Sequence, residues 1–90
     1  MVAPVLMRPD EMLCIKQAMD YTRKSDKTIR RWIKRYGIAR RSMDGGPYQV
    51  SVIALEMAMH GDFAALEMLR SGQRSAPEVR RYLDFLGLPE

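Results

Sequence analysis

The sequence has very little of the chemistry that disulfide and metal sites need. Its 90 residues include one cysteine, Cys14, and one histidine, His60. A single cysteine excludes an internal disulfide bond and is typical of proteins in the reducing cytoplasm. A structural zinc site takes four nitrogen or sulfur ligands, so these two residues cannot form one. We expect no metal and no cofactor, and we interpret Cys14 as a small buried apolar residue and His60 as a surface residue at a helix end.

Long apolar runs and glycine-rich motifs are also missing. No apolar run approaches the roughly 18 residues that a membrane span requires. The start of the chain lacks the basic and then apolar stretches of a secretory signal. Gly45-Gly46 is too short for the common nucleotide-binding motifs. We therefore expect a cytoplasmic protein that is not an enzyme and has no membrane partner.

What is present is an ordinary globular composition, with 47% hydrophobic and 29% charged residues. It predicts a single folded domain over residues 1–90 with a small core. The net charge of +4 is unevenly distributed. Residues 23–41 hold nine basic residues and one acid, a net charge of +8, whereas the rest of the chain carries −4. Such a basic block is either a solvated surface or a site for an anionic partner.

Two short helices are predicted in the first half of the chain. The spacing of apolar residues predicts a helix over residues 11–22, with Asp10 as its N-cap and Glu11 favourable to its dipole. Arg23-Lys24 forms a turn. A second helix is expected over residues 26–36.

The second helix has clear end signals and two distinct faces. Ser25 is the expected N-cap, and Gly37 is expected to end the helix. One arc carries the apolar residues Ile29, Trp32, Ile33 and Tyr36. The opposite arc carries Lys27, Thr28, Arg30, Arg31, Lys34 and Arg35. The apolar arc is suited to packing in the core, Trp32 included, and every charged group on the other arc is positive.

A β-hairpin is predicted next, with strands over residues 38–43 and 47–51. Its turn is Asp44-Gly45-Gly46, in which the glycines supply the positive φ that tight turns need. Tyr48 and Val50 alternate with a polar residue, as in a strand with one buried face.

Three helices are predicted after the hairpin. The first covers residues 52–60 with Ser51 as its cap, and the second covers residues 63–71 with Asp62 as its cap. The third begins at a capping box formed by Ser75 and Glu78 and continues to about Leu86. The apolar residues of this region are Leu55, Met57, Met59, Phe63, Leu66, Met68, Leu69, Tyr82, Leu83 and Phe85. They either complete the core or meet a neighbouring protomer or a partner protein.

This order of elements predicts a mainly α fold with a small β-hairpin, namely a winged helix-turn-helix with additional C-terminal helices. Residues 10–56 would form the helix-turn-helix and the wing, and residues 57–90 the C-terminal helices. An α-helix fits the major groove of B-DNA, and a hairpin beside it can reach a phosphate or the minor groove. Double-stranded DNA is therefore the expected partner.

Residues 13–55 resemble the small MerR-like winged-helix domains of excisionases, also called recombination directionality factors. The first helix carries Lys16-Gln17-Ala18, and the second begins with SDKTIRRWI from Ser25 to Ile33. The wing match consists of Arg41, Gly45-Gly46, Tyr48 and Val50-Ser51, followed by Ala54-Leu55. The chain departs from the pattern in the turn, where Arg23 and Lys24 replace a small and an apolar residue. In its whole length it resembles the excisionases of integrative and conjugative elements.

The resemblance implies a function without covalent chemistry. Excisionases bind adjacent sites in attachment-site DNA, often cooperatively, and bend the DNA so that a tyrosine-recombinase integrase excises the element. The implied partners are attachment-site DNA, the integrase and further copies of the chain in a head-to-tail arrangement. Such a protein would be associated with the nucleoid. Two alternatives remain open: a small winged-helix transcriptional regulator at a promoter, and a protein-interaction module whose basic face meets an acidic partner.

Twelve residues are candidates for DNA contact: Lys24, Ser25, Lys27, Thr28, Arg30, Arg31, Lys34, Arg35, Arg40, Arg41, Gly45 and Gly46. Base contacts are expected from Lys27, Thr28 and Arg31, near the start of the second helix. Arg35 is expected to reach only phosphate. Arg40 and Arg41 belong to the wing, whose glycines would allow close approach of the main chain.

Overall fold

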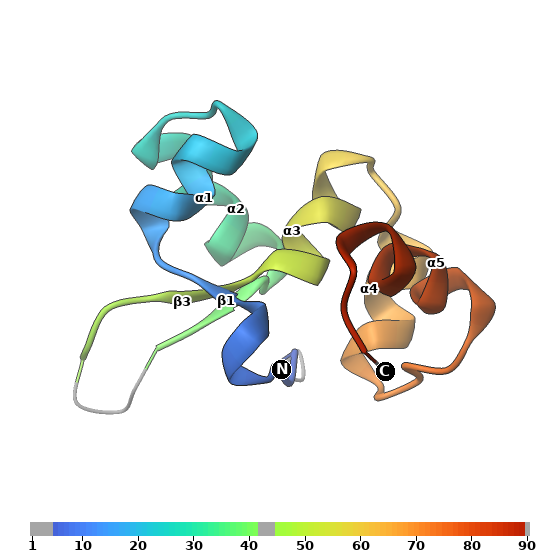
Figure 1. Ribbon diagram of the computed structural model, residues 1–90. Helices are drawn as coiled ribbons and strands as arrows, with labels where there is room; N and C mark the ends of the chain where they lie inside the picture. The colour runs from blue at the N-terminus through green and yellow to red at the C-terminus, as the bar shows by residue number, and fades with distance from the viewer. Residues whose placement is uncertain (1–4, 42–44, 90) are drawn as a thin grey trace.

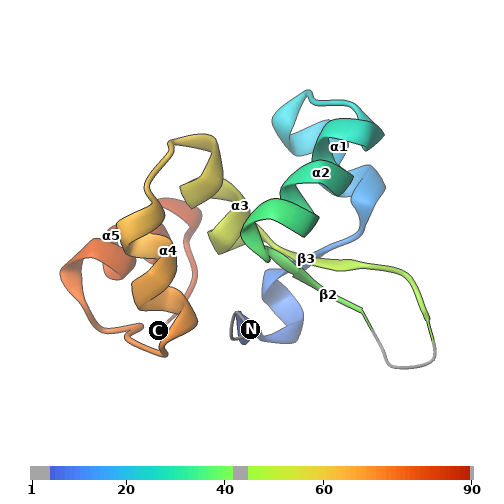
Figure 2. The ribbon, with the colours of Figure 1, turned by 180° about the vertical axis from the view of Figure 1, so that it is seen from behind.

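The computed structural model describes residues 5–41 and 45–89, which form a helical fold around a small antiparallel sheet (Figures 1 and 2). The elements are a 3-10 turn, Pro9–Glu11; the strands β1 Met12–Leu13, β2 Ala39–Arg40 and β3 Gln49–Ser51; and the helices α1 Ile15–Thr22, α2 Asp26–Tyr36, α3 Val52–Met59, α4 Phe63–Arg70 and α5 Pro77–Leu86. Figure 1 places α1 and α2 on one side, α4 and α5 on the other, and α3 between them. The prediction of a mainly helical fold with a small sheet is confirmed. None of the described helices is long and apolar enough to cross a lipid bilayer.

Helix α2 has the predicted bounds and the predicted end signals. The Ser25 hydroxyl accepts a hydrogen bond from the backbone N–H of Thr28 at 3.2 Å. At the other end Gly37 has a φ of +65° and donates its N–H to the Ile33 carbonyl. This left-handed φ favours glycine, and a Cβ atom at Gly37 would also lie 3.0 Å from Nη1 of Arg70, whose side chain would have to shift by a few tenths of an ångström.

Among the described residues the sheet has three strands, in the order β1-β3-β2, whereas the sequence predicts only the hairpin of β2 and β3. Val50 lies at its centre, opposite Leu13 on one side and Ala39 on the other. Val50 is fully buried and its neighbour Gln49 is exposed, which confirms the predicted alternation. Residues 42–43 of the predicted first strand and Asp44 of the turn lie outside the described residues.

The prediction for the start of the first helix is wrong. Helix α1 begins at Ile15, because Met12 and Leu13 are extended and pair with β3. The N-cap is therefore Cys14 rather than Asp10, and its Sγ accepts a hydrogen bond from the backbone N–H of Gln17 at 3.4 Å. Cys14 is exposed, so its interpretation as a buried apolar residue is also wrong.

The predicted N-caps of α3 and α4 are confirmed, and the predicted N-cap of α5 is not. Ser51 and Asp62 accept hydrogen bonds from the backbone N–H groups of Ala54 and Ala65, both at 3.2 Å. Helix α5 instead has Ala76 as its N-cap, with no side-chain cap and with a proline in its first turn. The predicted capping box of Ser75 and Glu78 is wrong, because the helix starts one residue later than that motif requires.

Helix α3 forms the centre of the core. Its residues Ile53–Met57 are all buried, and it packs against α1, α4, α5 and β3. The apolar arc of α2 joins this core through buried Ile29 and Ile33, with Trp32 packed against it and partly buried. The core role predicted for that arc is confirmed.

An ion pair between buried Glu11 and partly buried Arg74 links the first part of the described chain to the loop between α4 and α5. Glu11 is fully buried, and its two carboxylate oxygens accept hydrogen bonds from Nη1 and Nη2 of Arg74 at 3.3 and 2.5 Å. The backbone N–H of Arg8 also donates to Glu11, at 3.2 Å. Arg74 lies in the α4–α5 loop, 63 residues further along the chain. The sequence-based role of Glu11 at the start of a helix is therefore wrong.

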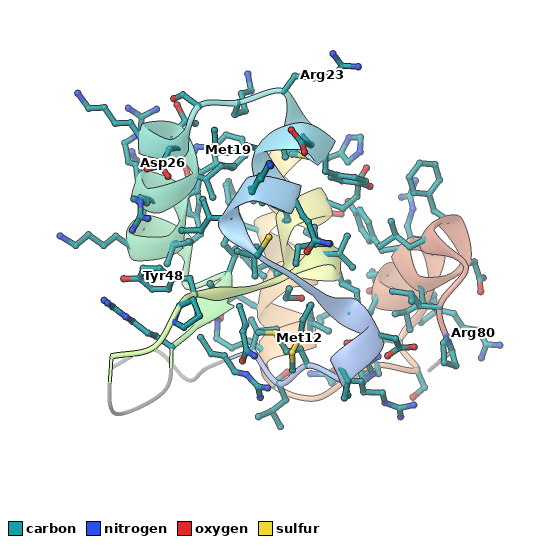
Figure 3. All side chains as sticks on the ribbon, turned by 60° about the vertical axis from the view of Figure 1, so that its left-hand side comes forward. Met12, Met19, Arg23, Asp26, Tyr48 and Arg80 are labelled. Carbon is teal, nitrogen blue, oxygen red and sulfur yellow. The ribbon has the colours of Figure 1, made fainter. Side chains whose placement is uncertain are left out.

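The turn between α1 and α2 contains a residue in the left-handed conformation. Arg23, which Figure 3 labels, has a φ of +61° and is the only non-glycine residue among the described ones with a positive φ. Side chains with a Cβ atom are disfavoured there by roughly 1–2 kcal/mol. The turn itself is held by hydrogen bonds from Arg23 N–H to the Met19 carbonyl and from Lys24 N–H to the Thr22 hydroxyl.

We expect Arg23→Gly to raise the free energy of unfolding by about 0.5–1 kcal/mol, because glycine relieves the backbone strain but loses more entropy on folding. Urea unfolding followed by circular dichroism measures the change. Arg23→Ala is the control, since it removes the same charge and keeps the Cβ atom. Equal stabilities of the glycine and alanine variants would contradict this account.

Candidate nucleic-acid interface

The outer face of α2 is basic and open to solvent, as predicted. Lys27, Arg30, Arg31, Lys34 and Arg35 are exposed, and Thr28 is partly buried. At 3.6 residues per turn, Lys27, Arg31 and Lys34 lie on successive turns of one stripe. Within residues 5–41 and 45–89, these three side chains have no hydrogen-bond or ion-pair partner. Their full positive charge is therefore available to an anion.

Arg30 differs from that stripe because it is held by other side chains. Its Nε donates to Oδ1 of Asp26 at 2.7 Å, and both groups are about half exposed. Its guanidinium carbon also lies 6.0 Å from the ring centroid of Tyr48. Asp26 on α2 and Tyr48 beside β3 lie on the same side of the molecule (Figure 3). Arg30 thus belongs to the edge of α2 that faces the hairpin.

The residues at the start of α2 cap the helix and also present polar groups on its surface. The Ser25 hydroxyl accepts from Thr28 N–H and donates to the Thr28 hydroxyl at 3.1 Å. Thr28 therefore keeps its own hydroxyl proton for another acceptor. Lys24 is exposed in the turn before the cap.

The hairpin arginines are exposed and engaged with the hairpin itself. Nε of Arg40 donates to the Gln49 side chain at 2.7 Å, across the β2–β3 pair. Arg41 donates from Nε to the Gly46 carbonyl at 2.8 Å and from Nη2 to the Gly45 carbonyl at 3.2 Å. Gly45 has a φ of +84°, as predicted for the turn. The two glycines thus supply carbonyl oxygens that hold an arginine.

Tyr48 joins the helix and the hairpin, a role that the sequence does not indicate. Its ring is partly buried and packs against the core. The guanidinium carbon of Arg41 lies 5.0 Å from the ring centroid, and that of Arg30 lies 6.0 Å from it. The two arginines are 11 positions apart in the chain and approach the same ring. In the sequence, Tyr48 belongs to the wing match and lies two positions before Val50, and neither signal predicts its contact with arginines.

The carboxyl end of α2 is anchored to α4. Nη2 of Arg70 donates to the backbone carbonyl of Tyr36 at 2.7 Å, and Nε of Arg70 pairs with Glu67 at 3.2 Å. The rings of Tyr36 and Phe63 also pack against each other, with centroids 4.9 Å apart and planes tilted by 33°. A cation at the carboxyl end of a helix donates a hydrogen bond to a free carbonyl and interacts favourably with the helix dipole. The C-terminal helices therefore fix the orientation of the basic helix.

Away from α2 and the hairpin in the sequence, two carboxylates accept hydrogen bonds from tyrosines. Tyr21 donates to Oε2 of buried Glu56 at 2.7 Å, while His60 Nε2 lies 3.0 Å from Oε1 of the same carboxylate. Tyr82 donates to Oδ2 of Asp62 at 2.8 Å. An open cleft of about 780 Å³ lies here, lined by Glu56, His60, Asp62, Arg81, Tyr82 and Phe85.

The apolar residues predicted for the C-terminal region divide between core and surface. Most complete the core, namely Leu55, Met57, Leu66, Leu69, Tyr82 and Leu83, with Met68 partly buried against it. Met59, Phe63 and Phe85 are exposed, with Phe85 at 72%. His60 is exposed at the end of α3, which confirms its placement.

The two hydrogen-bonded tyrosines make stability depend on alkaline pH. Burial, followed by the hydrogen bond to a carboxylate, raises the pKa of Tyr21 and of Tyr82 to about 12. The bond from Tyr82 holds the pKa of Asp62 below its ordinary value. A phenol whose pKa is raised on folding contributes stability that is complete below its ordinary pKa of 10 and lost as the pH rises toward 12.

We therefore expect the free energy of unfolding to fall between about pH 10 and pH 12, and to fall less in a Tyr21→Phe/Tyr82→Phe variant. Urea unfolding at intervals across this range measures the slope. Tyr48→Phe is the control, because no described residue accepts a hydrogen bond from its hydroxyl. An unchanged slope in the double variant would show that other groups cause the loss.

Among the described residues, no group of three or more histidine, cysteine, aspartate or glutamate side chains could hold a metal ion. Comparisons with protein-family models, with curated proteins and with solved structures gave no match.

Proposed function

We propose that this protein is a winged helix-turn-helix DNA-binding protein in which α2 enters the major groove and the β2–β3 hairpin acts as the wing. One observation carries the proposal: the stripe of Lys27, Arg31 and Lys34, which has no partner among the described residues, lies on a capped helix beside a hairpin that exposes two further arginines. A helix is about 10–12 Å wide with its side chains, which suits the major groove of about 12 Å. Base contact from a recognition helix comes from its N-terminal part, where Lys27, Thr28 and Arg31 lie.

Within this class, we propose an excisionase that binds and bends attachment-site DNA and so directs an integrase toward excision. The resemblance of residues 13–55 to excisionases supports this choice. Bending a site by 40–90° costs roughly 1–6 kcal/mol, which contacts along the curved duplex must offset. The hairpin arginines would extend the phosphate contacts beyond the groove that α2 occupies. In this proposal the protein acts in the cytoplasm on the nucleoid.

Cooperative binding of adjacent copies is part of the proposal. Exposed Phe85 lies on α5, outside the basic face of α2, whereas exposed Phe63 on α4 packs against Tyr36 at the end of α2. Apolar side chains in such a position suit contact with a neighbouring copy or with the integrase. Footprints on DNA that carries several sites test the contact between neighbouring copies. Independent occupancy of each site would contradict that contact.

The central experiment is an excision assay with the integrase and a plasmid that carries paired attachment sites, with and without this protein. We expect excised product only when the protein is present. Binding to the same DNA is measured in parallel against salt concentration. With about six phosphate contacts, log K should fall against log[salt] with a slope near −5.

The two measurements separate the alternatives. Salt-dependent binding without stimulation of excision would contradict the excisionase and favour a small transcriptional regulator. A flat salt dependence would contradict DNA binding through the basic face and favour a protein-interaction module.

A further inference from the structure

We propose that Tyr48 is a positioning residue for DNA binding, whose ring holds the guanidinium groups of Arg30 and Arg41 at the junction of α2 and the β2–β3 hairpin. The inference rests on the proposed function and deepens it, because it names the side chain that organises the two parts of the interface.

The geometry of the junction carries the proposal. The guanidinium carbons of Arg41 and Arg30 lie 5.0 and 6.0 Å from the ring centroid of Tyr48. A cation within about 6 Å of an aromatic centroid is attracted by the negative face of the ring. Arg30 comes from the helix, whereas Arg41 and Tyr48 come from the two arms of the hairpin. One ring therefore connects the elements that would contact DNA.

The ring can act as a fixed support because it is anchored on the protein. Tyr48 is partly buried and packs against the core, next to fully buried Val50 of β3. Among the described residues, its hydroxyl has no hydrogen-bond acceptor, so the aromatic ring is the part that the structure uses. Phenylalanine at this position should therefore preserve the role of Tyr48, whereas an aliphatic residue should lose it.

Each guanidinium is held on one side and keeps donors for an anion. Arg30 uses Nε for Asp26, at 2.7 Å. Arg41 uses Nε and Nη2 for the carbonyls of Gly46 and Gly45. A guanidinium carries five N–H donors, so both groups retain several for phosphate oxygens.

Placing two guanidiniums at one ring serves the binding of a polyanion. A free arginine loses side-chain entropy when it is ordered at an interface, and an arginine that is already ordered loses less. Two cations at one ring also repel each other, and the ring face, Asp26 and the glycine carbonyls offset this repulsion. Tyr48 thus prepares a paired positive site before DNA arrives.

The test compares Tyr48→Phe and Tyr48→Leu in the full chain. Binding to a fluorescein-labelled duplex of mixed sequence is followed by fluorescence anisotropy over a range of KCl concentrations. We expect the phenylalanine variant to bind within about twofold of the wild-type protein with the same salt slope. The leucine variant should bind about tenfold more weakly, with a slope that is shallower by one to two, because each lost phosphate contact removes about 0.9 from it.

Stability is measured on the same samples by urea unfolding, because a merely structural role would lower the fraction of folded protein and leave the salt slope unchanged. If the leucine variant does not fold, Tyr48→Met takes its place as a flexible apolar residue that fills the site. In a background with Arg30→Gln and Arg41→Gln, either aliphatic substitution should cause no further loss of affinity.

The outcomes distinguish this inference from the function on which it rests. A wild-type protein without salt-dependent binding would overturn both. A wild-type protein that binds, with an aliphatic variant of unchanged affinity and slope, would overturn the role of Tyr48 alone. A loss of affinity that persists in the double-glutamine background would also overturn it, because Tyr48 would then act through other groups.

Discussion

Replacing Arg74 with methionine is expected to lower the free energy of unfolding by about 3–5 kcal/mol. The substitution leaves the carboxylate of Glu11 fully buried, with only the backbone N–H of Arg8 as a described donor. A buried charge without its partner keeps the cost of desolvation and loses the attraction that offsets it. Small domains are stable by only about 5–15 kcal/mol, so this one change would unfold a large fraction of the molecules under mild stress.

Urea unfolding followed by circular dichroism at neutral pH measures this effect. Arg31→Met is the matched control, since the same chemical change at an exposed position should alter stability by less than about 0.5 kcal/mol. A Glu11→Leu/Arg74→Met variant should be more stable than either single variant, because it removes the buried carboxylate together with its cationic partner. A loss below about 1 kcal/mol in Arg74→Met would show that the pair is not a main support of the fold.

The second large effect concerns DNA affinity. A Lys27→Gln/Arg31→Gln/Lys34→Gln variant is expected to bind DNA on the order of 10²-fold more weakly at moderate salt, with a salt slope shallower by about two to three. The three side chains form one exposed stripe of α2 and have no partner within the described residues. Their removal should leave the fold intact, because none of them is buried.

The control for this variant removes the same charge elsewhere. Arg8, Lys16 and Arg81 are exposed and lie outside α2 and the hairpin. Changing these three to glutamine should leave the salt slope within about one of the wild-type value, because they are not expected to touch phosphates. Equal weakening in the two triple variants would assign the affinity to overall charge rather than to α2.

The elements that carry their own end signals were predictable from the sequence. Helix α2 begins after Ser25 and ends before Gly37, as a side-chain cap and a left-handed glycine dictate. The starts of α3 and α4 follow from Ser51 and Asp62 in the same way. These signals are local, since the capping residue and the residue whose N–H donates the hydrogen bond to it are three positions apart.

The start of α1 was not predictable in this way because a distant strand decides it. Met12 and Leu13 fit a helical apolar pattern, yet their backbone is taken up by β3, about 38 positions later in the chain. A pairing partner so far away leaves no mark in the local spacing of apolar residues. The helix therefore begins only where that pairing ends, and Cys14 caps it from the surface.

The candidate site also has a part that the sequence predicts and a part that it does not. The exposed basic face of α2 follows from helical periodicity, which places its charges opposite Ile29 and Ile33. The partners of individual arginines do not follow from it. Arg30 meets Tyr48 across 18 positions, and Arg70 reaches the Tyr36 carbonyl across 34. Only the folded chain brings these groups together, and no local signal could have indicated them.

Helix α3 has a consequence for how the protein unfolds. The boundary predicted between residues 56 and 57 falls inside this helix, whose buried residues pack on elements from both halves of the chain. A region that is buried on all sides opens only when the whole structure opens. The backbone amides of α3 should therefore exchange hydrogen at the rate of global unfolding, and the DNA-binding elements and the C-terminal helices should behave as one cooperative unit.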